Sequence, residues 1–132
     1  MENSIINALK RLERAGDENS RVTEKLKASC VELGEFIEKQ VPHDVTLPRD
    51  YIVKTHRGSY YFGKINPDQS FAYDDEIYTI NITVEPTRAI CLEFAKDISE
   101  GLLDEIAEFL EKRIKKEEQA IKIIEEKLVI TA

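Results

Sequence analysis

Residues 77–95 read IYTINITVEPTRAICLEFA, two apolar-rich runs on either side of Pro86. The apolar residues of the first run share one face of an extended chain: Tyr78, Ile80, Ile82 and Val84. Such alternation is typical of a strand that is buried on one face. The second run repeats the pattern with Ile90, Leu92 and Phe94. The stretch therefore predicts two antiparallel strands joined as a hairpin.

The register of this predicted hairpin depends on the length of its loop. A two-residue loop would set Ile80 opposite Glu93 and place a carboxylate on the apolar face. A three-residue loop over residues 86–88 sets Ile80 opposite Phe94 instead. Because a slip of one residue moves every side chain to the other face, we predict the three-residue loop.

The composition indicates an acidic globular protein. Of the 132 residues, 42% are hydrophobic and 34% are charged, and the net charge is −7. This length suits one domain, residues 1–132, that buries about two-thirds of its unfolded surface. Nucleic-acid binding depends on neutralising phosphates, so the acidic balance argues against it. No apolar run approaches the ~18 residues of a membrane-spanning helix, and the first residues lack a signal-peptide core, so we expect a cytoplasmic protein without a membrane partner.

Residues 1–41 are predicted to be helical, because apolar residues recur every three or four positions. They form a short stripe and a longer one: Ile5, Leu9 and Leu12, then Val22, Leu26, Cys30, Leu33, Ile37 and Val41. Between the stripes lie Gly16 and several candidate helix caps, so either two helices meet there or one helix crosses the segment. The stripes keep the same phase, which favours one interrupted helix. Pro42 should end it, and residues 42–50 are expected to be a linker.

The segment DYIVKTHRGSYYFGKI, residues 50–65, predicts a second hairpin with Arg57-Gly58 as a two-residue loop. Its register gives four pairs: Val53 with Phe62, Lys54 with Tyr61, Thr55 with Tyr60 and His56 with Ser59. A turn is expected at residues 66–69. Residues 51–95 should then form a four-stranded antiparallel sheet.

Ser99 is predicted to cap a final helix over residues 99–128. Glu117 interrupts its apolar stripe, which consists of Leu103, Ile106, Leu110, Ile114, Ile121, Ile124 and Leu128. The predicted fold is therefore α+β: a long N-terminal helix, four antiparallel strands with one face for the helices to cover, and a long C-terminal helix.

The predicted lengths of these elements indicate a partner. A helix over residues 100–128 would be ~40 Å long, whereas a strand of about eight residues spans ~27 Å. Ile121, Ile124 and Leu128 should therefore overhang the sheet. Either the short N-terminal stripe or another subunit must cover them, and an exposed apolar stripe usually marks an interface. A two-fold homodimer is the commonest closed solution.

Motifs that carry known chemistry are absent from the sequence. It has no Gly-rich phosphate loop, GxSxG, HExxH or paired-Cys metal spacing. Cys30 and Cys91 are expected to be buried free thiols. Asp68 and residues 74–76 miss the EF-hand spacing, which favours a solvated turn. We expect no catalytic residue, metal or cofactor.

One polar surface offers an alternative function. Lys54, His56 and Tyr61 should share the sheet face opposite the core, and Asn81, Thr83 and Cys91 join them if the strand order allows it. Convergent polar groups beside an aromatic ring can bind a small ligand, although an ordinary solvent-facing sheet surface explains them as well. The sequence thus favours a non-catalytic, homodimeric interaction module that binds protein through its amphipathic helices or open sheet face. The alternative is a ligand-binding or enzymatic domain that uses this polar face.

Overall fold

The computed structural model of the chain describes residues 2–66 and 79–131. Its elements are α1 (Glu2–Gln40), the 3-10 turn η1 (Pro48–Asp50), β1 (Tyr51–His56), β2 (Ser59–Ile65), β3 (Thr79–Asn81), α2 (Arg88–Ser99) and α3 (Leu102–Thr131). The strands form one antiparallel sheet in the order β1-β2-β3. The α+β class and the antiparallel sheet are confirmed. The described part of the chain has three strands and two C-terminal helices, where four strands and one helix were predicted.

Helix α1 continues through Gly16 as a single helix, as the shared phase of the stripes favoured, and it has no interruption there. A single glycine inside a helix is destabilising by only about 1 kcal/mol relative to alanine. The helix ends at Gln40, just before the residue that Pro42 pushes out of helical geometry. The predicted linker, residues 42–50, contains η1 and a bridge between Thr46 and Ile52.

The hairpin of β1 and β2 has the predicted register. All four predicted pairs are present, from Val53 opposite Phe62 to His56 opposite Ser59. Arg57 and Gly58 have φ angles of 50° and 79°, as a type I′ turn requires at both central residues. The expected turn at residues 66–69 falls largely outside the described residues.

The predicted hairpin over residues 77–95 is wrong. Ile80 and Ile82 do face the core, but β3 ends at Asn81 and residues 88–99 form helix α2. The Thr87 hydroxyl caps this helix by accepting a hydrogen bond from the Ile90 amide at 3.2 Å. Ile90 and Phe94, one helical turn apart, are buried. Residues four positions apart lie on the same face of a helix, so burial of this pair fits a helix as well as it fits the strand that was predicted.

The predicted helix over residues 99–128 begins later and ends later than expected. Ser99 is the last residue of α2, and its hydroxyl donates to the Lys96 carbonyl at 2.6 Å instead of capping α3. Gly101, with a φ of +106°, forms the bend from which α3 starts. Such a φ is open to glycine and strained for most other residues.

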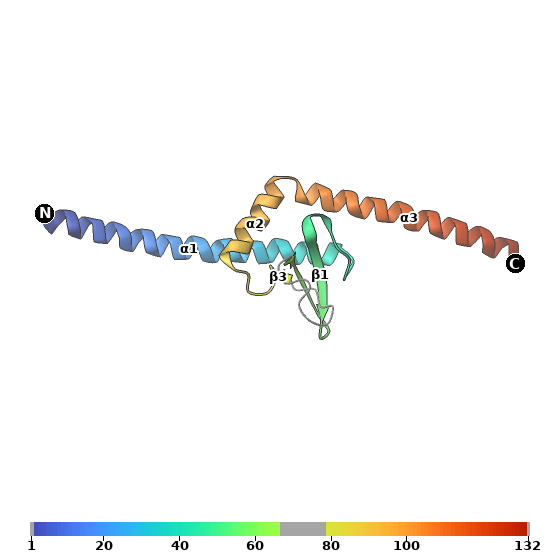
Figure 1. Cartoon of the computed structure of the whole chain (residues 1–132), viewed down its shortest axis with the longest axis horizontal. Coiled ribbons are helices and arrows are strands. Elements are labelled where there is room, and N and C mark those ends of the chain that lie inside the picture. The colour runs from blue at the N-terminus through green and yellow to red at the C-terminus, as the bar shows by residue number, and fades with distance from the viewer. Residues whose placement is uncertain (1, 67–78, 132) are drawn as a thin grey trace.

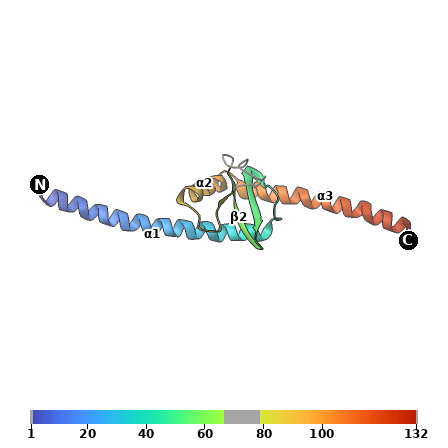
Figure 2. The ribbon, with the colours of Figure 1, turned by 60° about the horizontal axis from the view of Figure 1, so that its bottom comes forward.

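The core lies between one face of the sheet and helices α1 and α2 (Figure 2). Three aromatic rings meet at its centre, with centroids 5.5–5.8 Å apart: Tyr51, Phe62 and Phe94. Helix α1 approaches closely at Gly34, where a Cβ would stand 3.0 Å from the side chains of Ile82 and Thr83. No described helix combines the length and apolar character that crossing a bilayer requires.

Candidate interaction surface

Two helical arms extend from the central body in opposite directions (Figure 1). The N-terminal arm is residues 3–22 of α1, and the C-terminal arm is residues 114–129 of α3; every side chain in both ranges is exposed. At 1.5 Å per residue the arms are about 30 and 24 Å long. An isolated helix of this length is marginal in water, because most helical stability in proteins comes from packing.

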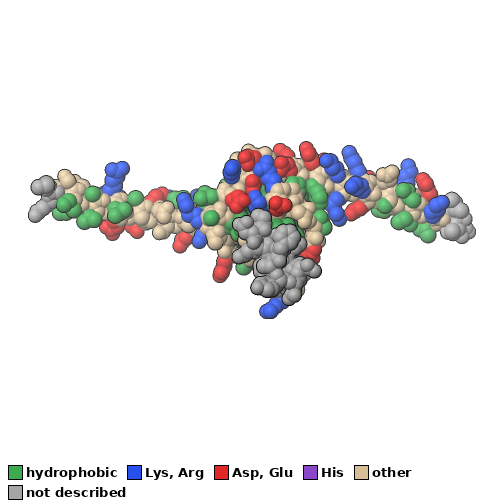
Figure 3. Space-filling view, viewed as in Figure 1, with side chains coloured by type: hydrophobic (Ala, Val, Ile, Leu, Met, Phe, Trp, Pro, Cys, Tyr) green, Lys and Arg blue, Asp and Glu red, His purple; other side chains and the backbone are tan. Residues whose placement is uncertain are grey.

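Each arm carries an exposed apolar stripe. Figure 3 shows hydrophobic side chains on both arms, in this view mainly along their lower edges. In the N-terminal arm Ile5, Leu9 and Leu12 are 59–67% exposed. The predicted overhang is equally open, with its three residues 53–61% exposed: Ile121, Ile124 and Leu128.

The N-terminal stripe does not cover the C-terminal one within the chain, because the two arms lie at opposite ends of the molecule (Figure 1). This excludes the intramolecular alternative for the described fold. That the overhang forms a subunit interface stays a prediction.

The C-terminal stripe begins as a packing surface within the chain. Leu103, Ala107 and Leu110 of α3 line a groove of about 230 Å³ against the end of α1. Helix α1 stops at Gln40, whereas the stripe continues along α3 at the same spacing through Ile114. The apolar surface that lines this groove therefore continues along the C-terminal arm.

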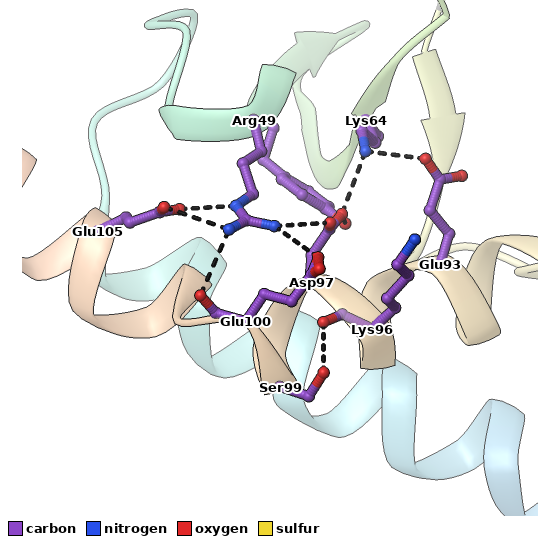
Figure 4. A network of polar contacts seen from close by, with 9 residues as sticks. Arg49, Lys64, Glu93, Lys96, Asp97, Ser99, Glu100 and Glu105 are labelled. Atoms are coloured by element: carbon purple, nitrogen blue, oxygen red, sulfur yellow. Dashed lines mark hydrogen bonds and ion pairs between the residues drawn. The ribbon is translucent and has the colours of Figure 1, made fainter.

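A polar network fixes the bend from which the C-terminal arm starts (Figure 4). Arg49 of η1 lies between α2 and α3. Its guanidinium donates to both carboxylate oxygens of Glu105 at 2.8 and 3.3 Å, to Glu100 at 3.0 Å and to Asp97 at 3.2 Å. One side chain thus binds the last turn of α2, the residue after it and the first turn of α3. A bidentate pair between arginine and a carboxylate restricts the relative orientation of the two groups and also stabilises their contact.

Asp97 is the buried acceptor at the centre of this network. It also accepts hydrogen bonds from the Tyr51 hydroxyl at 2.6 Å and from Lys64 at 3.1 Å. Burial alone would raise the pKa of Asp97, but the bonds from Tyr51, Lys64 and Arg49 outweigh it and hold that pKa below its usual value. Burial and the bond to Asp97 raise the pKa of Tyr51. Asp97 therefore accepts hydrogen bonds from three side chains that favour its ionised form, which suits a structural role better than proton transfer.

The polar sheet face is assembled only in part. Lys54 and Tyr61 lie opposite each other in β1 and β2, both half-buried, and Asn81 pairs with Gly63 on the same face. The backbone of His56 ends β1 opposite Ser59.

Two other residues proposed for this face are engaged elsewhere. Thr83 accepts a hydrogen bond from the Phe62 amide at 2.9 Å. Cys91 is in α2 and fully buried, so its placement on this face is wrong.

The two cysteines are buried free thiols, as predicted. The Cys30 thiol lies 3.9 Å from the carbonyl oxygen of Cys91. Burial, with the neighbouring Cys91 thiol, raises the pKa of Cys30 to about 12. A protonated, buried thiol is a poor nucleophile, and Cys91 is shielded from any substrate.

A second hollow, of about 370 Å³, lies where the end of α1 meets the β1–β2 hairpin. It is lined by Glu35, Glu38, Lys39, His43 and Tyr60. The His43 ring stacks on Tyr60 with centroids 3.8 Å apart. The pKa of Glu38 is raised, mainly by burial and to a lesser degree by the negative charge of Glu35. The described side chains that line this hollow include no nucleophile–base pair.

No group of three or more His, Cys, Asp or Glu side chains in residues 2–66 and 79–131 is placed to hold a metal ion. The acidic set of Asp68 and residues 74–76 lies outside the described residues.

The network that joins Arg49 to Asp97, Glu100 and Glu105 was not predicted from the sequence. These residues are distant in sequence from Arg49, so no local spacing connects them. One signal was present: Asp97 follows Phe94 by three positions, which places a carboxylate on the buried stripe once the segment is taken as a helix.

Comparison with known proteins found no matching protein-family model, no matching curated protein and no matching solved structure.

Proposed function

We propose that the chain is a non-catalytic interaction module that forms a homodimer through the apolar stripes of its two arms. The observation that carries this proposal is the exposure of both stripes, more than half of each stripe side chain, on helices that extend away from the core.

Both arms lack the packing that stabilises an amphipathic helix. A helix contributes to stability when its apolar face packs, and each arm presents such a face to solvent. Burying a whole Leu or Ile side chain is worth about 1.5–3 kcal/mol, so covering the exposed half of one contributes roughly 1 kcal/mol. A stripe of three such residues on each arm, counted in both copies, gives on the order of 10 kcal/mol before the entropy of association is subtracted. The cost of association is of the same order, about 4–15 kcal/mol, so the gain from the stripes is large enough to offset much of it.

The central body supports a scaffold role. Its polar network connects η1, α2 and α3, and no buried side-chain polar atom among the described residues is left without a hydrogen bond. Active sites, in contrast, usually hold perturbed groups that are accessible to substrate. The alternative ligand site around Lys54 and Tyr61 gains no support, because the hollows described above are lined by other residues.

The test is the solution mass of the full chain, measured by light scattering over a concentration series. We expect twice the chain mass at high concentration and dissociation on dilution. The association should persist in 1 M NaCl, because salt screens charge pairs but does not weaken apolar burial. A single-chain mass at every concentration would refute the proposal, and loss of the dimer in salt would show that charge, not the stripes, holds it.

A further inference from the structure

We infer that two copies pair antiparallel, with the N-terminal arm of each lying along the C-terminal arm of the other in one defined register. This inference rests on the proposed homodimer and names the surfaces that form it. The N-terminal stripe of one copy is thus covered by the C-terminal stripe of a second copy of this chain.

The spacing of the stripes carries the inference. Apolar residues follow at steps of four and three in the N-terminal arm and at steps of three and four in the C-terminal arm. One order is the reverse of the other, as an antiparallel pair requires. Three apolar layers result: Ile5 with Leu128, Leu9 with Ile124 and Leu12 with Ile121. Both stripes keep the 3.5-residue mean step of a coiled-coil seam.

One polar interruption of each arm falls in the same layer of this register, and the layer beyond it sets Asn19 opposite Ile114. Continuing the pairing inward sets Gly16 opposite Glu117. Glycine leaves room for the longer acidic side chain to bend towards solvent, so the interruption of one arm accommodates that of the other. Any shift by a heptad would instead set apolar residues against Gly16 or Glu117.

Pairing of the C-terminal arm with itself is disfavoured by charge. A parallel pair would stack Glu117 of both copies in the same seam layer. An antiparallel pair would set Glu118 opposite Glu118, and Glu111 opposite Glu125, along its flank. Like charges held this close are destabilising. The exchanged pair has one such flank contact, between Glu13 and Glu118.

The shape of the molecule agrees with the exchange. Helices α1 and α3 run in the same sense along the long axis, and the arms project from opposite ends (Figure 1). A two-fold axis across that long axis brings each N-terminal arm to the other copy's C-terminal arm and reverses its direction. Two identical contacts then close the assembly. A head-to-tail arrangement would keep the arms parallel, set Ile5 opposite Glu117 and leave an open chain of molecules.

The test is disulfide trapping in the full chain under a mild oxidant, read on a non-reducing gel. The double variant Leu12→Cys with Ile121→Cys places two thiols in one predicted layer. The matched control is Leu12→Cys with Ile114→Cys, whose second thiol is displaced by one heptad, about 10 Å, beyond the reach of a disulfide. The native thiols, Cys30 and Cys91, are buried, and the unchanged chain reports any cross-link that they form.

We expect covalent dimer as the main product of the Leu12/Ile121 variant and of a mixture of the two single variants. Each single variant alone and the Leu12/Ile114 control should stay single chains. Cross-linking by Ile121→Cys alone would show that like arms pair, and a ladder of larger products would show head-to-tail assembly; either overturns the inference. A dimeric mass without any cross-link overturns the register while the proposed dimer stands, whereas a monomeric mass refutes both.

Discussion

Replacing Ile121 and Ile124 together by glutamate should dissociate the proposed dimer. Both side chains lie on the C-terminal arm, 53% and 58% exposed, and neither belongs to the core. In the exchanged arrangement they fill two of the three apolar layers on each side of the two-fold axis. The substitution therefore removes apolar burial and places carboxylates in the seam, without touching the packing of the body.

The size of the effect follows from the exposed fractions. Covering the exposed half of an isoleucine is worth roughly 1 kcal/mol, and the two-fold axis presents each residue twice. The variant therefore loses about 4 kcal/mol of association free energy, before any penalty for desolvating the new carboxylates. At about 1.4 kcal/mol per tenfold change, the dissociation constant should rise on the order of a thousandfold.

Light scattering at a concentration where the wild-type chain is dimeric measures this change. The matched control is Ile123→Glu: Ile123 is 54% exposed on the same helix but lies beside the seam, so its replacement should leave the mass unchanged. Near-ultraviolet circular dichroism of the core tyrosine should show that the body of both variants stays folded. A double variant that keeps the wild-type mass, or a control that dissociates equally, would refute the reasoning.

Three further predictions follow from particular contacts. Thr87→Ala removes the cap acceptor of the Ile90 amide and should lower the free energy of unfolding by about 1 kcal/mol in urea titration. Because the pKa of Asp97 is lowered in the folded state, the stability that its ionised form contributes is fully present above about pH 4 and is lost as the pH falls through the folded-state pKa. Asp97→Asn should lower the free energy of unfolding by about 2–3 kcal/mol at pH 7. The same variant should lose less stability than the wild-type chain as the pH falls below about 4. Glu13→Lys should tighten the dimer roughly fivefold in sedimentation equilibrium, by about 0.5 kcal/mol for each new contact with Glu118, and adding Glu118→Lys should reverse that gain.

The β1–β2 hairpin was predictable because its information is local. Arg57-Gly58 supplies the turn, and the alternation on each side of it selects the same register from Val53 to His56. Tyr60 and Phe62 repeat that alternation on β2. When turn chemistry and side-chain period agree, few alternative pairings remain. The end of α1 before Pro42 was predictable for a similar reason, since a proline restricts the residue before it.

Residues 88–95 were misassigned because a short apolar run fits two periods. Ile90, Leu92 and Phe94 satisfy a strand, while Ile90 and Phe94 alone satisfy a helix. The deciding features lie outside the run. Thr87 caps the helix at its start, and Asp97 lies on its buried face three positions after Phe94. The predicted strand ended before Asp97. Residues 88–95 include neither Thr87 nor Asp97.

The network around Arg49 could not be predicted from the sequence for a different reason. Its partners are 48 to 56 positions away, and they come together only after the sheet and α2 have packed. Arg49 itself has a φ of 60°, a conformation that a non-glycine residue adopts at a cost. Tertiary contacts to Glu105 and Asp97 offset that cost, and no local pattern announces such contacts.

The proposed dimer depends both on the apolar stripes, which follow from local spacing, and on the tertiary contacts that hold the bend before α3. The stripes determine which surfaces can pair, and they are readable in the sequence because their spacing is local. The direction in which the C-terminal arm leaves the body is determined by the bend at Gly101 and by Arg49, which joins both sides of that bend. An amphipathic helix with a purely apolar seam could pair with many others. Here Glu117 makes a parallel pair of C-terminal arms unfavourable, Gly16 accommodates it in the unlike pair, and the bend that Arg49 holds directs the arms in the opposite directions that a two-fold exchange requires.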